Sequence, residues 1–405
     1  MNAPNSPSVL SGVPMAPKDP ILGVTEIYNA DKNPAKVNLG VGIYYDDAGK
    51  VPVLECVQRA ERQLAETVAP RAYLPIDGLP AYDSAVQQLV FGADSQALKD
   101  KRIVTVQALG GTGGLKIGAD FLKRIAPSAT VWLSDPSWEN HQALFEAAGF
   151  TVKAYPYYDP SSHGVKFTEM MSTLESLPSG SIVVLHACCH NPTGVDLTGE
   201  QWTRVLAAVK SRGLVPFLDI AYQGFADGID ADAAPVRQFA SAGGVVFVSS
   251  SFSKSLSLYG ERVGAFSLVA DSADEAARAL SQLKRIVRTN YSNPPTHGGK
   301  VAATVLTTPE LRVLWEKELG GMRERIRVMR RQFVEKLREK APARDFAFVM
   351  RQRGMFSYSG LTSDQVTRLR EEFSVYAIDT GRICVAALNT RNIDHVVGAV
   401  AKVIA

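Results

Sequence analysis

The stretch SSSFSKSLSLYGERVG, residues 249–264, decides the fold. Apolar residues at 245–248 before it and at 263–269 after it each predict a short buried strand. The second strand begins directly after the turn, whereas a parallel crossover needs about a dozen or more residues, so the two strands are predicted to be antiparallel. The link therefore places Lys254 and Arg262 near one end of a sheet.

A lysine in this position can be a nucleophile. Burial beside a second cation lowers the pKa of a lysine and frees its lone pair. Arg262, together with the hydroxyls of Ser251 and Ser253, could clamp a phosphate group. The alternative is that Lys254 is an ordinary surface lysine in a polar turn. The rest of the chain must decide between these interpretations.

Strand and helix patterns alternate through the middle of the chain. Short apolar strands are predicted at 103–109, 130–135, 152–157, 182–187, 215–220 and 245–248. Helical periods separate them, for example at 115–124, 141–148 and 199–212. Such alternation predicts an α/β fold with a mostly parallel central sheet and helices on both faces. Ligands then bind beyond the carboxyl ends of the strands.

The two ends of the chain predict a smaller α/β domain. Residues 37–44 alternate in polarity, and further strands are predicted at 346–350, 355–361 and 383–388. Helices are predicted at 19–28, 54–67, 273–288, 362–372 and 393–403, with a long charged helix at 309–340 broken by Gly320 and Gly321. We expect a flexible arm at 1–18, a small domain at 19–49 and 319–405, and a large domain at 50–318.

Composition excludes several classes of protein. The net charge of +3 over 405 residues, with no long Lys/Arg block, argues against a nucleic-acid partner. No run approaches about 18 apolar residues, so no membrane span is expected. Four cysteines indicate no disulfide framework and favour the cytoplasm. Cys188 and Cys189 should point to opposite faces of a strand; with His190 they could instead be metal ligands, but no second cluster at zinc spacing exists, and no metal is expected.

Three more segments at predicted strand ends carry polar groups. GGTGG at 110–114 opens a helix whose N-terminus could bind an anion with Thr112, or it is a structural glycine turn. Asn191 could donate to a phenolate-like oxygen, or form an Asn-Pro turn. Asp219 is costly to bury without a cationic partner such as a pyridinium N–H, and Tyr222 could bond the same ring. With Lys254 and Arg262, these groups form a socket for pyridoxal 5'-phosphate.

The motifs NPTG, LDIAYQGF, SFSKSLSLYGERVG and NYSNPP resemble fold-type I pyridoxal-phosphate enzymes, specifically class I aspartate and aromatic aminotransferases. The resemblance runs from about Asp19 to the C-terminus. CCHNPTG, AYQGF, SLYGERVG and RGMFSYSGL are most similar to bacterial aromatic-amino-acid (tyrosine) aminotransferases.

The resemblance implies a role for each cofactor-binding residue. Lys254 would join the cofactor covalently and then carry the proton, with Asp219 on the ring nitrogen. The other implied cofactor contacts are Asn191 and Tyr222 on the ring oxygen, Trp138 stacked on the ring, His141 behind Asp219, and Gly111, Thr112, Ser251 and Arg262 on the phosphate. Tyr73 would reach the phosphate from a partner subunit, which implies a homodimer with shared active sites.

The resemblance also implies the substrate contacts. Arg382 would bind the α-carboxylate of the amino acid, with the backbone of Gly42 beside it and with Trp138 and Asn191 in contact with the substrate. Arg288 would cross from the partner subunit to bind the distal carboxylate of a dicarboxylic substrate.

The predicted reaction is transamination of tyrosine, phenylalanine and aspartate with 2-oxoglutarate by a ping-pong mechanism. Strict aspartate enzymes tend to have lysine, threonine and asparagine where this sequence has Tyr45, Val51 and Ala72, and a less polar pocket mouth admits aromatic side chains more easily. The alternatives are an aspartate aminotransferase with minor aromatic activity, another pyridoxal-phosphate enzyme such as a decarboxylase or lyase, and a non-catalytic binding module.

Overall fold

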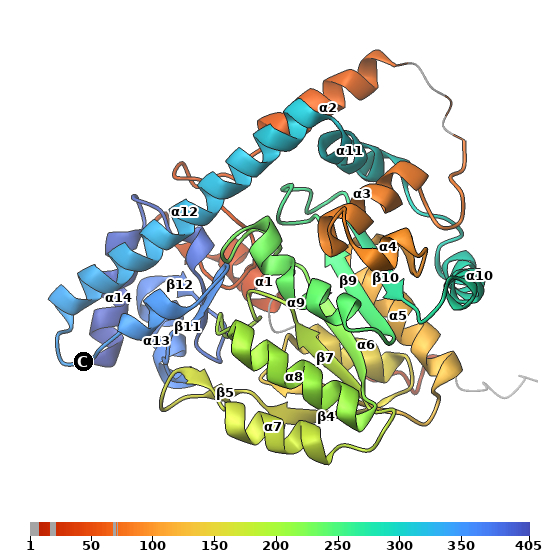
Figure 1. The fold of residues 1–405 in the computed structure, drawn as a ribbon. Helices are drawn as coiled ribbons and strands as arrows, with labels where there is room; N and C mark the ends of the chain where they lie inside the picture. The colour runs from red at the N-terminus through yellow and green to blue at the C-terminus, as the bar shows by residue number, and fades with distance from the viewer. Residues whose placement is uncertain (1–7, 17–21, 68–69, 71) are drawn as a thin grey trace, which may run out of the picture.

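A seven-stranded sheet forms the centre of the molecule (Figure 1). The computed structural model describes residues 8–16, 22–67, 70 and 72–405. The strand order is β2-β10-β9-β8-β7-β3-β4. The strands are β2 (Ile103–Leu109), β3 (Thr130–Asp135), β4 (Thr151–Pro156), β7 (Ile182–His186), β8 (Val215–Ile220), β9 (Val246–Ser251) and β10 (Val263–Val269). Strands β9, β8, β7, β3 and β4 are mutually parallel, and β10 is antiparallel to β2 and β9, which confirms the mostly parallel sheet.

Both faces of the sheet are covered by helices because successive strand residues point to opposite sides. Ile182 and Val184 belong to one hydrophobic core, and Val183 and Leu185 to another. The first core includes side chains from α5 (Gly110–Ile125), α6 (Glu139–Ala147) and α10 (Ala273–Asn290). The second includes side chains from α3 (Pro80–Phe91), α7 (Phe167–Ser176), α8 (Gly199–Arg212) and α9 (Ile229–Ser241).

Residues from the two ends of the chain lie side by side. β1 (Val37–Asn38) pairs in parallel with β12 (Val375–Tyr376), and β11 (Phe356–Tyr358) pairs antiparallel with β13 (Arg382–Cys384). The remaining elements are α1 (Leu22–Ala30), α2 (Glu55–Glu66), α4 (Gln96–Lys99), β5 (Tyr158–Asp159), β6 (Gly164–Val165), α11 (Thr296–Thr307), α12 (Pro309–Lys340), the 3₁₀ helices η1 (Ala347–Arg351) and η2 (Val385–Ala387), α13 (Ser363–Phe373) and α14 (Ile393–Ile404). The predicted boundaries at 50 and 318 stay a prediction; α12 crosses the second of them.

The structure corrects several local predictions. α12 is not broken at Gly320 and Gly321, because Leu319 and Met322 are buried on either side, and this packing outweighs the cost of about 1 kcal/mol for each helical glycine. Where a strand is predicted at 346–350, the chain forms the 3₁₀ helix η1 (Ala347–Arg351). Of the strand predicted at 383–388, only Ile383 and Cys384 lie in β13, because the chain continues as the 3₁₀ helix η2. Of 37–44, only β1 is a strand.

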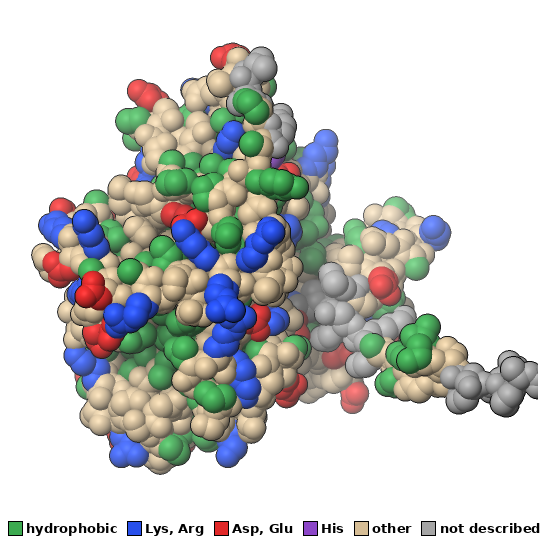
Figure 2. Space-filling view, turned by 90° about the vertical axis from the view of Figure 1, so that its right-hand side faces the viewer, with side chains coloured by type: hydrophobic (Ala, Val, Ile, Leu, Met, Phe, Trp, Pro, Cys, Tyr) green, Lys and Arg blue, Asp and Glu red, His purple; other side chains and the backbone are tan. Residues whose placement is uncertain are grey.

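The N-terminal segment is exposed, and the surface near α10 carries charges of both signs. Within 8–16, Val9 and Met15 are almost fully exposed, and the rest of the predicted arm, like the start of the predicted helix at 19–28, lies outside the described residues. On the side of α10, Lys and Arg side chains are interspersed with Asp and Glu (Figure 2). Among the described helices, none is long and apolar enough to cross a membrane.

Candidate active site

A cavity of about 360 Å³ opens beyond the carboxyl ends of β7, β8 and β9 and at the N-terminus of α5. This is the edge of the sheet at which parallel α/β folds bind ligands. Its wall is formed by Val41, Gly42, Gly111, Thr112, Leu115, Trp138, His186, Asn191, Asp219, Ala221, Tyr222, Ser251, Ser253, Lys254, Tyr259, Arg262, Phe356 and Arg382.

Lys254 projects into this cavity from the turn between β9 and β10. The antiparallel register, with Gly264 opposite Ser251, confirms the predicted link and brings Arg262 back to the same end of the sheet. The Lys254 Nζ lies 4.9 Å from the centroid of the Tyr222 ring. Burial lowers the pKa of Lys254 to about 8; the charge of Asp219 opposes this shift and that of Arg262 adds to it. Lys254 is therefore a partly deprotonated amine near neutral pH.

The lowered pKa predicts the reactivity of Lys254 in the cofactor-free protein. Only the neutral amine attacks an acylating reagent, so the rate of acylation of Lys254 should rise tenfold per pH unit and level off at a pH of about 8. Peptide mass spectrometry at a series of pH values measures this rate. Asp219→Asn removes a charge that raises the pKa, so the midpoint should move to lower pH. A midpoint near the ordinary lysine value of 10.5 would contradict this interpretation.

Asp219 is a buried carboxylate with one unused oxygen. It lies one residue before the end of β8, opposite His186 of β7 and Ser249 of β9. Its Oδ2 lies 2.9 Å from the His141 Nε2, whereas its buried Oδ1 has no partner among the described residues. Burial raises the pKa of Asp219, but the hydrogen bond and charge of His141 and the charge of Lys254 outweigh that effect and hold the pKa below its ordinary value. Asp219 is therefore an anion that lacks a cationic partner at Oδ1.

A buried polar chain extends behind Asp219. The Ser137 hydroxyl lies 3.0 Å from the His141 Nδ1 and 3.3 Å from the His186 Nε2. Burial lowers the pKa of His186 to about 3, so this ring is neutral. His141 lies behind Asp219, as the resemblance implies. Ser137 and His186 were not predicted from the sequence. His186 is the last residue of a buried strand, and its sequence position does not distinguish it from a residue of the hydrophobic core.

The N-terminus of α5 and the turn after β9 form a cradle of hydrogen-bond donors. The Gly110 N–H donates to the Arg262 carbonyl over 2.9 Å, and a Cβ at Gly110 would lie 2.3 Å from the Arg262 guanidinium. Arg262 donates to the Ser253 hydroxyl at 3.3 Å, and the Ser251 hydroxyl donates to that of Ser253 at 3.1 Å. Helix N–H groups, hydroxyls and a guanidinium together favour a phosphate.

Arg382 is a buried cation without a carboxylate partner among the described residues. Its side chain is 2% exposed; it donates to the Asn191 Oδ1 at 3.1 Å and to the Gly40 carbonyl at 2.6 Å. Its Nε is buried and unpaired. Burial lowers the pKa of Arg382. A buried guanidinium of this kind is stabilised by an incoming carboxylate. Gly42, nearby, could carry no side chain, since a Cβ would lie 2.7 Å from the Phe356 ring.

Most of the predicted site residues meet at this cavity, and three do not line it. The eleven on its wall are Gly42, Gly111, Thr112, Trp138, Asn191, Asp219, Tyr222, Ser251, Lys254, Arg262 and Arg382, and His141 contacts Asp219 behind it. Tyr73 is 92% exposed and Arg288, in the last turn of α10, is also exposed. The three residues assigned to the pocket mouth, Tyr45, Val51 and Ala72, do not line the cavity either.

Tyr259 and Phe356 also line the cavity without having been predicted from the sequence. The Tyr259 hydroxyl accepts a hydrogen bond from the Tyr44 N–H at 2.9 Å, which ties the N-terminal segment to the turn after Lys254. The Phe356 ring lies 4.4 Å from the Arg382 guanidinium carbon. Tyr259 lies in the motif SFSKSLSLYGERVG and Phe356 in RGMFSYSGL. Neither motif indicates by itself what the tyrosine hydroxyl or the phenylalanine ring contacts.

The cysteine pair departs from its prediction. The Sγ atoms of Cys188 and Cys189 lie within 4.8 Å of each other and of an Asp232 oxygen, rather than on opposite faces of a strand. β7 ends at His186, and Cys189 has a φ of 52°, which turns both thiols to one side. The Asp232 oxygens already accept N–H bonds from Gly224, Ala226, Asp227 and Gly228. The pKa of both thiols is raised, for Cys188 mainly by the hydrogen bond with Cys189 and for Cys189 mainly by burial.

The cavity fits pyridoxal phosphate by its donor set. The unpaired Asp219 Oδ1 suits a protonated ring nitrogen, the α5 cradle suits the phosphate, and Lys254 supplies the amine. Burial raises the pKa of Tyr222 well above its usual value, so its hydroxyl stays protonated and can donate to the ring oxygen.

Comparisons with known proteins point to one family. The family model for aminotransferase class I and II matches residues 34–400. The chain is 62% identical over 397 residues to an aspartate aminotransferase of Pseudomonas aeruginosa, covering 98% of this chain and 100% of the relative. It is 51% identical to the aromatic-amino-acid aminotransferase of Escherichia coli, covering 95% and 97%. The crystal structure of an aromatic-amino-acid aminotransferase from Burkholderia pseudomallei, covalently bound to pyridoxal phosphate, is 63% identical, with a TM-score of 0.96 and coverage of 98% and 100%.

Proposed function

Because the chain belongs to the class I and II aminotransferase family and is a pyridoxal-phosphate-dependent aminotransferase, we propose that it transfers the amino group of tyrosine, phenylalanine and aspartate to 2-oxoglutarate. The observation that carries this proposal is the meeting of Lys254, Asp219 and Arg382 at one cavity. An amine with a lowered pKa, a carboxylate with an unpaired oxygen and a guanidinium with no carboxylate partner among the described residues suit the α-carbon, the cofactor ring and the carboxylate of an amino acid.

Each residue has a separate task in this proposal. When bound, the cofactor supplies an aldehyde that reacts with amines and a protonated ring that withdraws electrons. Arg382 orients the α-carboxylate through its free donors. The Lys254 Nζ takes the α-proton and returns it to the neighbouring cofactor carbon, which its lowered pKa favours. Asp219 holds a proton on the ring nitrogen by its negative charge.

The relatives support two classes of substrate. Similar proteins are named both aspartate aminotransferase and aromatic-amino-acid aminotransferase, at 62% and 51% identity. We propose that Arg382 binds both classes alike, whereas Arg288 serves only the dicarboxylic substrates. Tyr45, Val51 and Ala72 would then keep the pocket mouth less polar in the assembled enzyme.

Arg288→Leu tests this division of substrates. The variant should lose about 30-fold or more in kcat/KM for aspartate and glutamate, since the distal carboxylate would be left unpaired. The kcat/KM for phenylalanine should stay within about threefold, because that substrate has no second carboxylate. Half-reaction rates measured by cofactor absorbance give both values.

The matched control for this test is Arg285→Leu, which removes an exposed arginine from the same helix one turn earlier. It should leave both substrate classes unchanged. Equal losses for aspartate and phenylalanine in Arg288→Leu, or no loss for aspartate, would contradict the proposed role of Arg288.

We propose a homodimer whose two subunits share their active sites. The exposure of Tyr73 and Arg288, away from the cavity wall of their own chain, supports this arrangement. A hybrid dimer of one Lys254→Ala and one Arg288→Leu subunit can be purified through two different tags. It should keep about half of the wild-type aspartate activity, because one of its two sites would combine an intact Lys254 with an intact Arg288. If Arg288 acts within its own subunit, the hybrid should be almost inactive on aspartate.

We also propose a cytoplasmic location. The four cysteines are free and buried, which suits a reducing compartment.

A further inference from the structure

A second cavity, separate from the active site, lies between α12 and two chain segments. Its volume is about 260 Å³, and none of its residues lines the cavity that holds Lys254. The lining comes from Phe225–Asp227 after β8, from α12, and from Met350–Gly354. Five of the lining residues are arginines (Arg323, Arg327, Arg330, Arg331 and Arg353), and Asp227 is the single acidic residue among them. The wall therefore has a formal excess of four positive charges.

The arginines gather here because of their spacing on α12. From position 323, the other three arginines follow after four, seven and eight residues (327, 330 and 331), so the four share one helix face. The glutamates that alternate with them in the sequence, such as Glu324 and Glu335, do not line the cavity. Like charges at i and i+4 destabilise a helix. On α12 the arginines thus line the cavity and the glutamates do not, although the Glu324 carboxylate lies 3.8 Å from the Arg327 Nη1.

Some of these arginines hold the surrounding backbone in place. Arg323 donates to the Gly224 carbonyl at 2.7 Å, and Arg327 donates to the Ala226 carbonyl at 2.8 Å. Asp227 lies 3.0 Å from Arg327 and 3.3 Å from Arg353, so the one carboxylate is shared by two guanidinium groups. Arg330 is buried and bonded to the backbone carbonyls of 349, 353, 354 and 356 and to a hydroxyl.

Other groups on the wall have no partner. The Arg331 guanidinium makes no hydrogen bond or ion pair within the part of the chain that the structure describes, and Arg323 uses only one of its nitrogens. Gln352 is 2% exposed; its Nε2 donates to the Tyr358 carbonyl at 3.2 Å, whereas its buried Oε1 accepts nothing. The wall thus carries free cationic donors, and the free acceptor belongs to Gln352, which lines both this cavity and the adjoining one.

We propose that this cavity binds a small oxyanion of the phosphate class. Guanidinium groups match the oxygens of a phosphate in charge and in fork geometry. A hydrogen phosphate or pyrophosphate also carries an O–H group, which the Gln352 Oε1 can accept, whereas a dicarboxylate has no such donor at neutral pH. The volume lies below the 300 to 1,000 Å³ of sites for larger ligands, so it suits a small ligand. This inference does not rest on the proposed substrates.

Calorimetric titration of the holoenzyme with pyrophosphate tests the proposal. The bound cofactor fills the phosphate cradle at α5, and a saturating non-reacting dicarboxylate occupies the substrate groups, so that only a separate site gives heat. Arg331→Gln should weaken pyrophosphate binding about tenfold or more, and Arg323→Gln should do the same. Arg331 is exposed and makes no hydrogen bond or ion pair with the described residues, so that variant should fold and turn over substrate as the wild type does.

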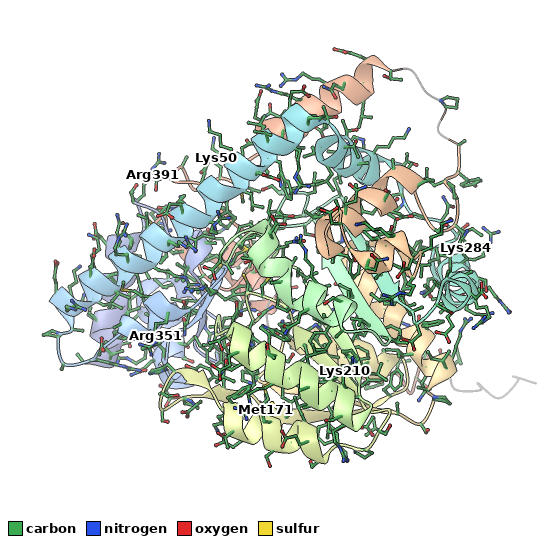
Figure 3. The ribbon with its side chains drawn as sticks, viewed as in Figure 1. Lys50, Met171, Lys210, Lys284, Arg351 and Arg391 are labelled. Atoms are coloured by element: carbon green, nitrogen blue, oxygen red, sulfur yellow. The ribbon has the colours of Figure 1, made fainter. Side chains whose placement is uncertain are left out.

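The matched control is Arg351→Gln. Arg351 precedes Gln352 in the sequence, but it lines the adjoining cavity and not the one with the five arginines. Its side chain, labelled in Figure 3, donates to the Ser162 carbonyl. Its removal changes the net charge equally and should alter pyrophosphate affinity less than twofold. Absence of binding to the wild type, or equal affinities in all three variants, would overturn the proposal.

Discussion

Lys254→Ala should lower turnover of every amino-acid substrate by at least about 10⁴-fold. In the proposed function the same amine attaches the cofactor and moves the proton, and among the described residues no other lysine lines the cavity. Exchange of the substrate α-hydrogen with deuterated solvent should disappear together with turnover, which nuclear magnetic resonance can follow. Pyridoxal phosphate should still bind, because the cradle at Gly111, Ser251 and Arg262 remains.

Lys254→Arg is the matched control for charge. It keeps a cation beside Asp219 but supplies no neutral amine, since arginine stays protonated. It should be as inactive as the alanine variant. If the arginine variant retained substantial turnover or α-hydrogen exchange, positive charge rather than nucleophilic and basic chemistry would be the function of position 254.

Asp219→Asn should lower kcat by about 10³-fold or more while keeping the shape of the side chain. The neutral amide cannot stabilise a proton on the ring nitrogen, and without that proton the ring withdraws electrons poorly. Single-turnover rates of both half-reactions measure the loss. Both should fall, because both need the same proton.

His141→Asn provides the comparison for Asp219. The His141 Nε2 orients Asp219 from behind and contributes to its lowered pKa, so its loss should cost less than the loss of the carboxylate itself. Circular dichroism should show both variants folded. Two results would contradict the view that the carboxylate matters more than the imidazole. One is an Asp219→Asn enzyme whose kcat is within tenfold of the wild-type value, and the other is a His141→Asn enzyme whose kcat is lower than that of Asp219→Asn.

Much of this site is predictable from the sequence because it is built at strand ends. Asp219 follows four apolar residues, and Lys254 follows a strand by a few residues, so the α/β rule brings them to one edge. Arg382 and Arg288 carry no such signal. Only the resemblance to a family identified them, and the structure then places Arg382 in the cavity and Arg288 outside it.

The mistaken predictions come from tertiary packing and backbone conformation. α12 runs through Gly320 and Gly321 because neighbouring side chains such as Trp315 and Ile326 are buried against the rest of the protein. Cys189 is not part of a strand, because its backbone has a positive φ. The identity of a cysteine does not predict this conformation. Arginines and glutamates alternate along α12 in the sequence. The helical period groups the arginines on one face, but it does not tell that this face meets Asp227.

The central claim is that the Lys254 Nζ forms a carbon–nitrogen double bond with the cofactor aldehyde. Borohydride reduces such a bond to a stable secondary amine, so treatment of the holoenzyme followed by peptide mass spectrometry locates the attachment. The account predicts that the cofactor mass is found on the peptide containing Lys254 and is absent from Lys254→Ala. Attachment to a different lysine, or no attachment in protein saturated with the cofactor, would contradict it.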